Sequence, residues 1–203
     1  MQDKEIANNY DFWGAPPESQ SVSTMGIFVF VECNELAIEQ SSFEALGKAR
    51  ELGDALGTGV AAIILNSNDD NLANSLIHAG ANKVFLPSDD RFQNYETELY
   101  CNKSLSLIHR DNPEIFIAAL SSITRDFFPR LAQRIPTGLV SGCTNLDIDT
   151  TERSLLATHP IYGGKMFEVM TWKKSRPQMV LLQPGIFPPL IMDEFRSGEL
   201  EKI

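Results

Sequence analysis

Three continuous apolar runs, each separated from the next by segments with helical spacing, constrain the fold of this chain most strongly. The runs cover residues 27–31, 60–65 and 115–120, and such runs are typical of strands that are buried on both faces. Between the first two, apolar residues recur at helical spacing over 41–56, and Gly57 follows where a C-cap glycine is expected. This alternation predicts a mainly parallel sheet with helices on both faces.

The remaining elements extend this prediction along the chain. Further helices are expected at 70–79, 95–109 and 124–134, with a short strand at 84–86. The pattern then changes to short strands between turns, which predicts an antiparallel extension within 138–183. The predicted fold class is therefore an α/β three-layer sandwich whose mainly parallel sheet is of the nucleotide-binding-like kind, with an antiparallel C-terminal extension.

The chain is predicted to hold one domain with a segment at each end. Residues 1–24 are polar and are interpreted as an N-terminal arm, in which Tyr10, Phe12 and Trp13 are candidates for docking. Residues 25–184 form the predicted domain. Residues 185–203 are marked by prolines and are predicted to form an extended C-terminal arm or linker.

Composition excludes several classes of protein. The net charge of −10 argues against a nucleic-acid partner, and no apolar stretch reaches the roughly 18–20 residues of a membrane span. The first residues carry acids and no apolar run, so a cytoplasmic protein is expected. Cys33, Cys101 and Cys143 lack C-x-x-C spacing, which favours buried unpaired thiols over a disulfide framework or a metal site.

The loops that follow the predicted strands are the places to look for a site. No glycine fingerprint of a dinucleotide or P-loop site is present, and the loop at 66–70 is interpreted as a helix cap. The loop at 121–126 offers hydroxyls, helix amides and Arg125, which suit an anion. The alternative is a capped helix start in which Asp126 pairs with Arg130. Both interpretations stay open.

Five segments resemble, in order and spacing, motifs of electron transfer flavoprotein alpha subunits. Residues 121–132 resemble T-S-x-x-G-R-D-L-A-P-R-[LV]-A. The other four resemble T-G-L-x-[AS]-D-[CV]-T at 137–144, T-R-P-[AI]-[YF]-G-G-N at 158–165, R-P-Q-M at 176–179 and R-P-G-x-[FM] at 183–187. The resemblance is nearest to the electron-bifurcating type. It covers the amino-terminal domain, and the family's FAD-holding carboxyl-terminal domain has no counterpart in the matched segment.

This resemblance implies an electron-carrier component with no catalytic side chains of its own. It implies pairing with a beta-type subunit and FAD-mediated electron transfer between an acyl-CoA dehydrogenase or similar flavoenzyme and an acceptor. The FAD is expected to be shared with or held by the partner subunit, and AMP or NAD stays open as an additional ligand of the complex. The cofactor-binding residues it implies are Ser122, Thr124, Arg125, His159, Tyr162, Gly163, Gly164 and Lys165.

The sequence also departs from the family motifs at four positions. His159 replaces an arginine, so a titratable side chain stands where the family has a permanent cation. Lys165 replaces an asparagine and is a candidate for a compensating charge. Gly142 replaces an aspartate and Thr124 a glycine. Two alternative functions without a redox role therefore remain, a stand-alone adenine-nucleotide-binding module and an assembly scaffold.

Overall fold

The structure is a computed structural model, and it describes residues 26–34, 37–172 and 174–203. The predicted N-terminal arm lies outside these residues. Within them, no helix is both long and apolar enough to cross a membrane. All three cysteines are buried and unpaired, as predicted. The described residues hold no group of three or more His, Cys, Asp or Glu side chains suited to a metal.

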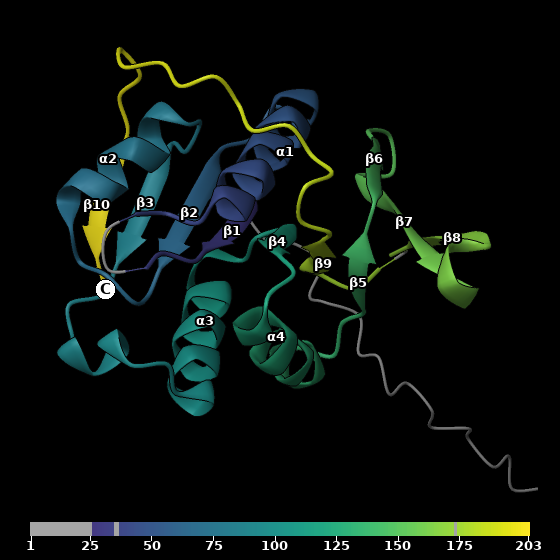
Figure 1. Cartoon of the computed structure of the whole chain (residues 1–203), viewed down its shortest axis with the longest axis horizontal. Coiled ribbons are helices and arrows are strands. Elements are labelled where there is room, and N and C mark those ends of the chain that lie inside the picture. Colours follow the sequence, from purple (N-terminus) through teal and green to yellow (C-terminus); the bar gives the residue numbers. More distant parts are fainter. Residues whose placement is uncertain (1–25, 35–36, 173) are drawn as a thin grey trace, which may run out of the picture.

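A seven-stranded parallel sheet forms the centre of the fold (Figure 1). Its central strands are buried along their whole length, which explains their continuous apolar sequences. The order of strands across the sheet is β10 (Glu199–Lys202), β3 (Lys83–Leu86), β2 (Val60–Ile64), β1 (Ile27–Val31), β4 (Ile115–Ala119), β9 (Gln178–Leu182) and β5 (Leu139–Cys143).

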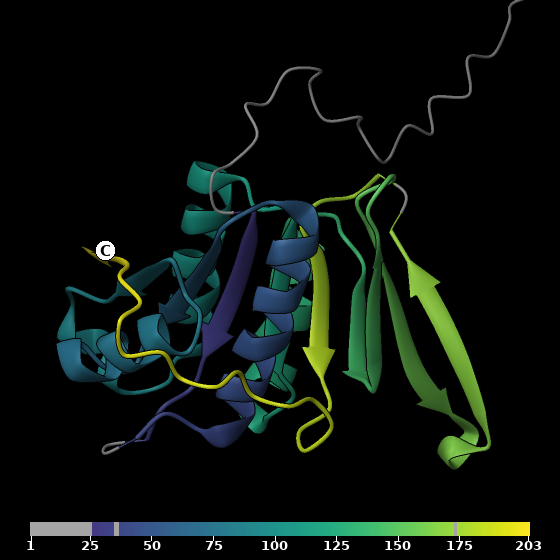
Figure 2. The ribbon, with the colours of Figure 1, turned by 90° about the horizontal axis from the view of Figure 1, so that it is seen from above.

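Helices cover both faces of this sheet, as the alternating pattern predicts (Figures 1 and 2). Residues of α1 (Gln40–Leu56) and α2 (Asp70–His78) share one core cluster with Ile27, Val29 and Val31 of β1. The alternate residues Phe28 and Phe30 face the second cluster, under α3 (Thr97–Asp111) and α4 (Ser122–Arg134). The layers therefore follow from side chains that alternate across each strand. Gly57 ends α1 in the left-handed conformation, with φ 65°.

A small antiparallel sheet stands beside the main one. It contains β6 (Asn145–Asp149), β7 (Ser154–Ile161) and β8 (Met166–Thr171), and a 3-10 turn, η2 (Tyr162–Gly164), joins the last two. The antiparallel extension is therefore confirmed, but its predicted extent is wrong. Residues 138–140 and 179–182 were expected within it, whereas 139–140 belong to β5 and 179–182 to β9 of the parallel sheet. β9 is buried on both faces, so it needs the cover that only the main sheet provides.

A buried polar network joins the two sheets at the start of β7 and β9. The fully buried Gln178 accepts a hydrogen bond from the backbone N–H of Leu155 at 2.7 Å and donates one to the carbonyl of Arg153 at 2.9 Å. The Arg153 side chain in turn binds both carboxylate oxygens of Glu114 at 2.6 and 2.8 Å. Glu114 directly precedes β4, so the network fixes the small sheet to the large one.

The C-terminal strap (residues 185–198) crosses α1 and α2 and leads into β10 (yellow in Figure 1). The backbone N–H of Gly185 donates to Glu44 of α1 at 2.7 Å. A Cβ atom at Gly47 would lie 2.8 Å from the backbone nitrogen of Leu190, so only glycine allows this close approach. The strap lies within the segment predicted to form an extended arm or linker, whereas β10, which follows it, was not predicted.

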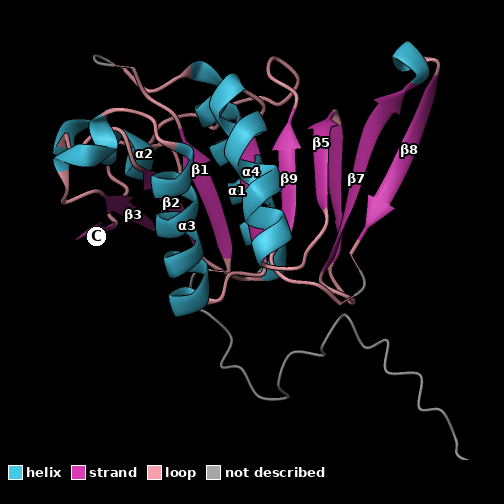
Figure 3. Cartoon of the chain, turned by 90° about the horizontal axis from the view of Figure 1, so that it is seen from below, coloured by secondary structure: helices cyan, strands magenta, loops and turns pink. Residues whose placement is uncertain are grey.

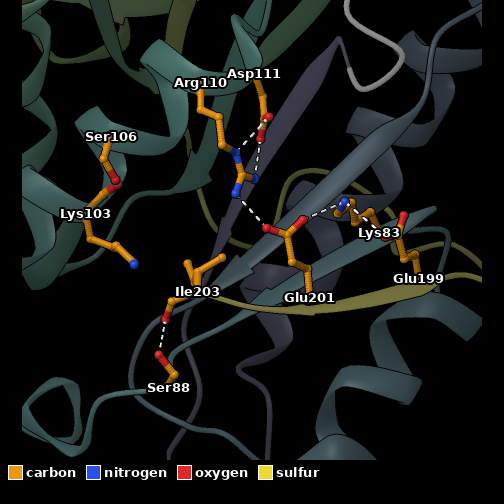
Figure 4. Close-up of polar contacts among 9 residues, drawn as sticks. All are labelled: Lys83, Ser88, Lys103, Ser106, Arg110, Asp111, Glu199, Glu201 and Ile203. Atoms are coloured by element: carbon orange, nitrogen blue, oxygen red, sulfur yellow. Dashed lines mark hydrogen bonds and ion pairs between the residues drawn. The ribbon is translucent and has the colours of Figure 1, made fainter.

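Charged side chains fix β10 at the edge of the sheet (Figure 4). Glu201 lies between two cations, with its oxygens 2.7 Å from Lys83 Nζ and 2.6 Å from Arg110 Nη1. Both cations also lie over the ring of Phe85, at 5.4 and 5.1 Å from its centre. The last residue, Ile203, accepts from the Ser88 hydroxyl at 2.8 Å.

Candidate functional site

The start of α4, which carries the first three predicted site residues, is a closed capping box. The Ser121 hydroxyl accepts from the backbone N–H of Thr124 at 3.1 Å, and the Thr124 hydroxyl accepts from that of Ser121 at 2.8 Å. Thr124 also donates to the carbonyl of Ala119 at 2.7 Å and is 1% exposed. The capped helix start is therefore confirmed, and so is the pairing of Asp126 with Arg130, at 3.3 Å.

A carboxylate of the chain itself lies beside this helix start. Glu32 directly follows β1, the strand at which the order of strands in the sheet reverses. The Glu32 carboxylate accepts a hydrogen bond from the Ser121 hydroxyl. Burial raises the pKa of Glu32 above its usual range; the bond from Ser121 offsets part of this rise, and Glu39 adds to it. Of the predicted residues here, only Ser122 and Arg125 are exposed to an external ligand.

We expect the Glu32→Gln variant to be more stable than the parent protein at neutral pH. A carboxyl group whose pKa is raised by folding costs stability when it is ionised, and this cost disappears below about pH 4.5, where both states are protonated. The gain should therefore grow as pH rises from 4 to 7. Urea unfolding at several pH values measures it, and a gain that is constant with pH would contradict the assignment.

The other predicted site residues lie at the tip of the β7–β8 hairpin. His159 faces Glu168 across the strands, with its Nε2 atom 3.3 Å from a carboxylate oxygen. Tyr162 is 76% exposed and has a φ of 50°, and the two glycines that follow have φ values of 68° and 83°. A Cβ atom at Gly163 or Gly164 would meet nothing within 4 Å, so the turn requires glycine for its backbone and not for space.

The two groups of predicted residues share one edge of the sheets but do not form one enclosed pocket. Backbone hydrogen bonds connect the strand ends in the order Leu120 to Leu182, Gln183 to Cys143, and Thr144 to Thr158. The ends of β9 and β5 therefore lie between the start of α4 and β7. Seven of the eight residues reach solvent, in two separate parts of the surface, whereas Thr124 is buried.

The β7–β8 hairpin also exposes apolar side chains that the sequence analysis did not single out. Figures 2 and 3 show it projecting from one end of the body. Every residue of β8 is exposed, and β8 is an edge strand of its sheet. Phe167 and Val169, on one face, are 65% and 60% exposed, and Met166 and Met170, on the other, are 56% and 42% exposed. In the sequence, residues 166–171 have the pattern of a strand, but polar and apolar residues do not alternate along it.

The exposed members of the predicted set have side chains of a kind that can bind a flavin. Arg125 and Lys165 bring cations to exposed positions, and cations suit both the phosphates and the anionic reduced ring of a flavin. Ser122 adds an exposed hydroxyl at the start of α4. Thr124 does not fit, because its hydroxyl is buried in the capping box. A cavity of about 560 Å³ at the same edge is lined by other residues.

Comparison with known proteins gives relatives whose names all refer to electron transfer flavoproteins, FixB proteins or electron transfer subunits. The model of the electron transfer flavoprotein domain matches residues 27–203. "Electron transfer flavoprotein subunit alpha" of Clostridium acetobutylicum is 34% identical over 180 residues, which cover 88% of this chain and 54% of that protein. "Protein FixB" of Bradyrhizobium diazoefficiens is 31% identical over 165 residues, with 80% and 44% covered. "Acryloyl-CoA reductase electron transfer subunit beta" of Anaerotignum propionicum is 28% identical over 182 residues, with 79% and 50% covered. The chain spans about half the length of these relatives.

Proposed function

Because this chain belongs to the electron transfer flavoprotein family, we propose that it is an alpha-type domain that pairs with a beta-type subunit. In this complex it supports FAD-mediated electron transfer in the cytoplasm, between an acyl-CoA dehydrogenase or similar flavoenzyme and an acceptor. The observation that carries the proposal is the β7–β8 hairpin. An edge strand that is apolar and exposed on both faces is typical of a surface that another chain covers.

The hairpin suits such a partner in both shape and chemistry. Phe167 and Val169 offer adjacent side chains on one face of β8, and aromatic residues at the centre of an interface contribute most to binding. The cross-strand pair of His159 and Glu168 supplies a polar rim on the other face. A partner that presents an apolar sheet face would cover this surface and leave the glycine turn at its border.

The cofactor is proposed to lie at that border. FAD supplies the electron chemistry when it is bound, since its ring takes up and releases electrons. Arg125, Lys165 and Ser122 would hold its negatively charged groups, and the exposed Tyr162 would lie against it, while Gly163 and Gly164 keep the turn narrow. His159 would add a cation only when it is protonated. AMP and NAD stay open as additional ligands of the complex.

Co-expression with a beta-type subunit tests this proposal. We expect a complex on size exclusion that absorbs as a flavoprotein, and we expect Arg125→Ala to lower its flavin content or shift the flavin midpoint potential without changing the unfolding midpoint. Arg130→Ala is the matched control, because Arg130 lies on the same helix and pairs with Asp126. A chain that stays a colourless monomer would overturn the proposal, and a stable colourless complex would favour the assembly scaffold.

A further inference from the structure

A cavity of about 560 Å³ opens at the carboxyl ends of β1, β2 and β3, apart from the residues that the proposed function uses. Its walls are the loops that follow these strands and the 3-10 helix η1 (Asp90–Gln93). The carboxyl edge is the usual place for a ligand in a parallel α/β sheet. The volume lies within the range of small-molecule sites.

Hydrogen bonds within the chain fix the walls in place. The Asn66 side chain donates to the carbonyl of Cys33 and accepts from its thiol at 3.1 Å, so the loops after β1 and β2 are tied together. Burial raises the pKa of this thiol to about 11, so Cys33 is a neutral part of the wall at pH 7. Asp89 caps η1 and binds the Arg91 guanidinium at 2.8 and 2.6 Å. A ligand would therefore meet a largely preformed surface.

Carboxamide groups dominate the lining. A carboxamide offers both a donor and an acceptor, which matches hydroxyl and amide groups of a ligand. The side chains of Asn68 and Asn94 make no hydrogen bond within the described part of the chain, so both are available. The five carboxamides of the lining are those of Asn34, Asn66, Asn68, Gln93 and Asn94.

The charge of the lining disfavours anions. Among the described residues, the lining contains two carboxylates, Asp89 and Asp90, and no Lys, Arg or His. Arg91 neutralises the first, whereas the contact of Asp90 is a long hydrogen bond of 3.4 Å from Gln93. A dianionic phosphate about 6 Å from one unpaired carboxylate is disfavoured by about tenfold even at the dielectric constant of water.

We propose that this cavity binds a small uncharged molecule of about nucleoside size that carries several hydroxyl or amide groups, and that it rejects the phosphorylated form of the same molecule. The inference does not depend on the proposed electron-transfer role. The proposed site also differs from that of a nucleotide-binding module. In such a module the phosphate contributes to binding, whereas here it weakens binding.

Titration calorimetry of the whole chain with adenosine and with AMP tests the inference, because the two probes differ only in the phosphate. We expect saturable binding of adenosine and binding of AMP that is weaker by about tenfold or more. The double variant Asn68→Leu, Asn94→Leu should lose adenosine binding. Asn74→Leu is the matched control, since Asn74 is an exposed asparagine of α2 outside the cavity.

Removal of the Asp90 carboxylate distinguishes charge repulsion from steric exclusion as the reason for weaker AMP binding. We expect Asp90→Asn to narrow the ratio of the two dissociation constants by about threefold or more, through tighter AMP binding. The proposal is overturned if adenosine shows no saturable binding, if AMP binds as tightly as adenosine to the parent chain, or if the double variant binds adenosine like the Asn74→Leu control.

Discussion

Replacing Phe167 with glutamate should weaken the complex with the beta-type subunit by about 100-fold or more. The side chain belongs to the second residue of β8, is 65% exposed and lies on the same face of the hairpin as Val169. A glutamate at this position would place a charge in the apolar interface that we propose, where its desolvation costs binding free energy. Surface plasmon resonance with immobilised beta-type subunit measures the change.

Phe195→Glu is the matched control for this prediction. Phe195 belongs to the C-terminal strap, far along the chain from the hairpin, and is 98% exposed. The same substitution there changes charge and apolar area alike but leaves β8 intact. Equal losses of affinity in the two variants would place the interface elsewhere, and an unchanged affinity in Phe167→Glu would remove the hairpin from it. Thermal midpoints of both variants should match that of the parent chain, because both side chains are exposed.

Replacing Gln178 with leucine should lower the free energy of unfolding by about 2 to 3 kcal/mol. Gln178 is fully buried at the start of β9, and its side chain satisfies the N–H of Leu155 and the carbonyl of Arg153. The carbonyl keeps a second donor in Arg176, at 3.0 Å, so the cost comes mainly from the buried N–H that is left without an acceptor. Urea unfolding with an unchanged m-value measures this loss.

The control for this variant lies directly after the same strand. Gln183 directly follows β9 and its side chain is exposed, so Gln183→Leu should change stability by less than about 0.5 kcal/mol. Hydrogen exchange adds a local test, because the amide of Leu155 should lose protection in Gln178→Leu more than the amides of β1 do. A Gln178→Leu protein as stable as the control would mean that the two sheets are not held together through this side chain.

The sequence was sufficient for the central part of the fold and for the family. Runs that are apolar on both faces, such as 27–31 and 60–65, have few alternatives to a covered parallel strand, and the structure and the family match confirm both predictions. Local patterns failed where pairing depends on distant residues. β9 looks like any short apolar strand, and only its insertion between β4 and β5 makes it parallel.

The candidate site was harder to predict than the fold. The capping box was readable, because Ser121 and Thr124 have the spacing that the motif requires. The contact of Ser121 with Glu32 was not, since these residues are 89 positions apart. A local sequence pattern also does not show which side chains are exposed to solvent. The apolar hairpin and the carboxamide-lined cavity therefore could be identified only from the structure. The roles of Arg125 and the hairpin turn stay predictions.

The position of β10 has a consequence for how the chain is made. β3 is complete at Leu86, but the strand that covers its outer edge begins at Glu199, and the hydrogen bond from Ser88 to Ile203 spans 115 residues. At about 5–20 residues per second, a ribosome would need about 6 to 23 s to supply that cover. During this interval the open edge of β3 is a template for pairing with another nascent chain. Lys83, at the start of β3, is the type of side chain that discourages such pairing until Glu199 and Glu201 arrive to neutralise it.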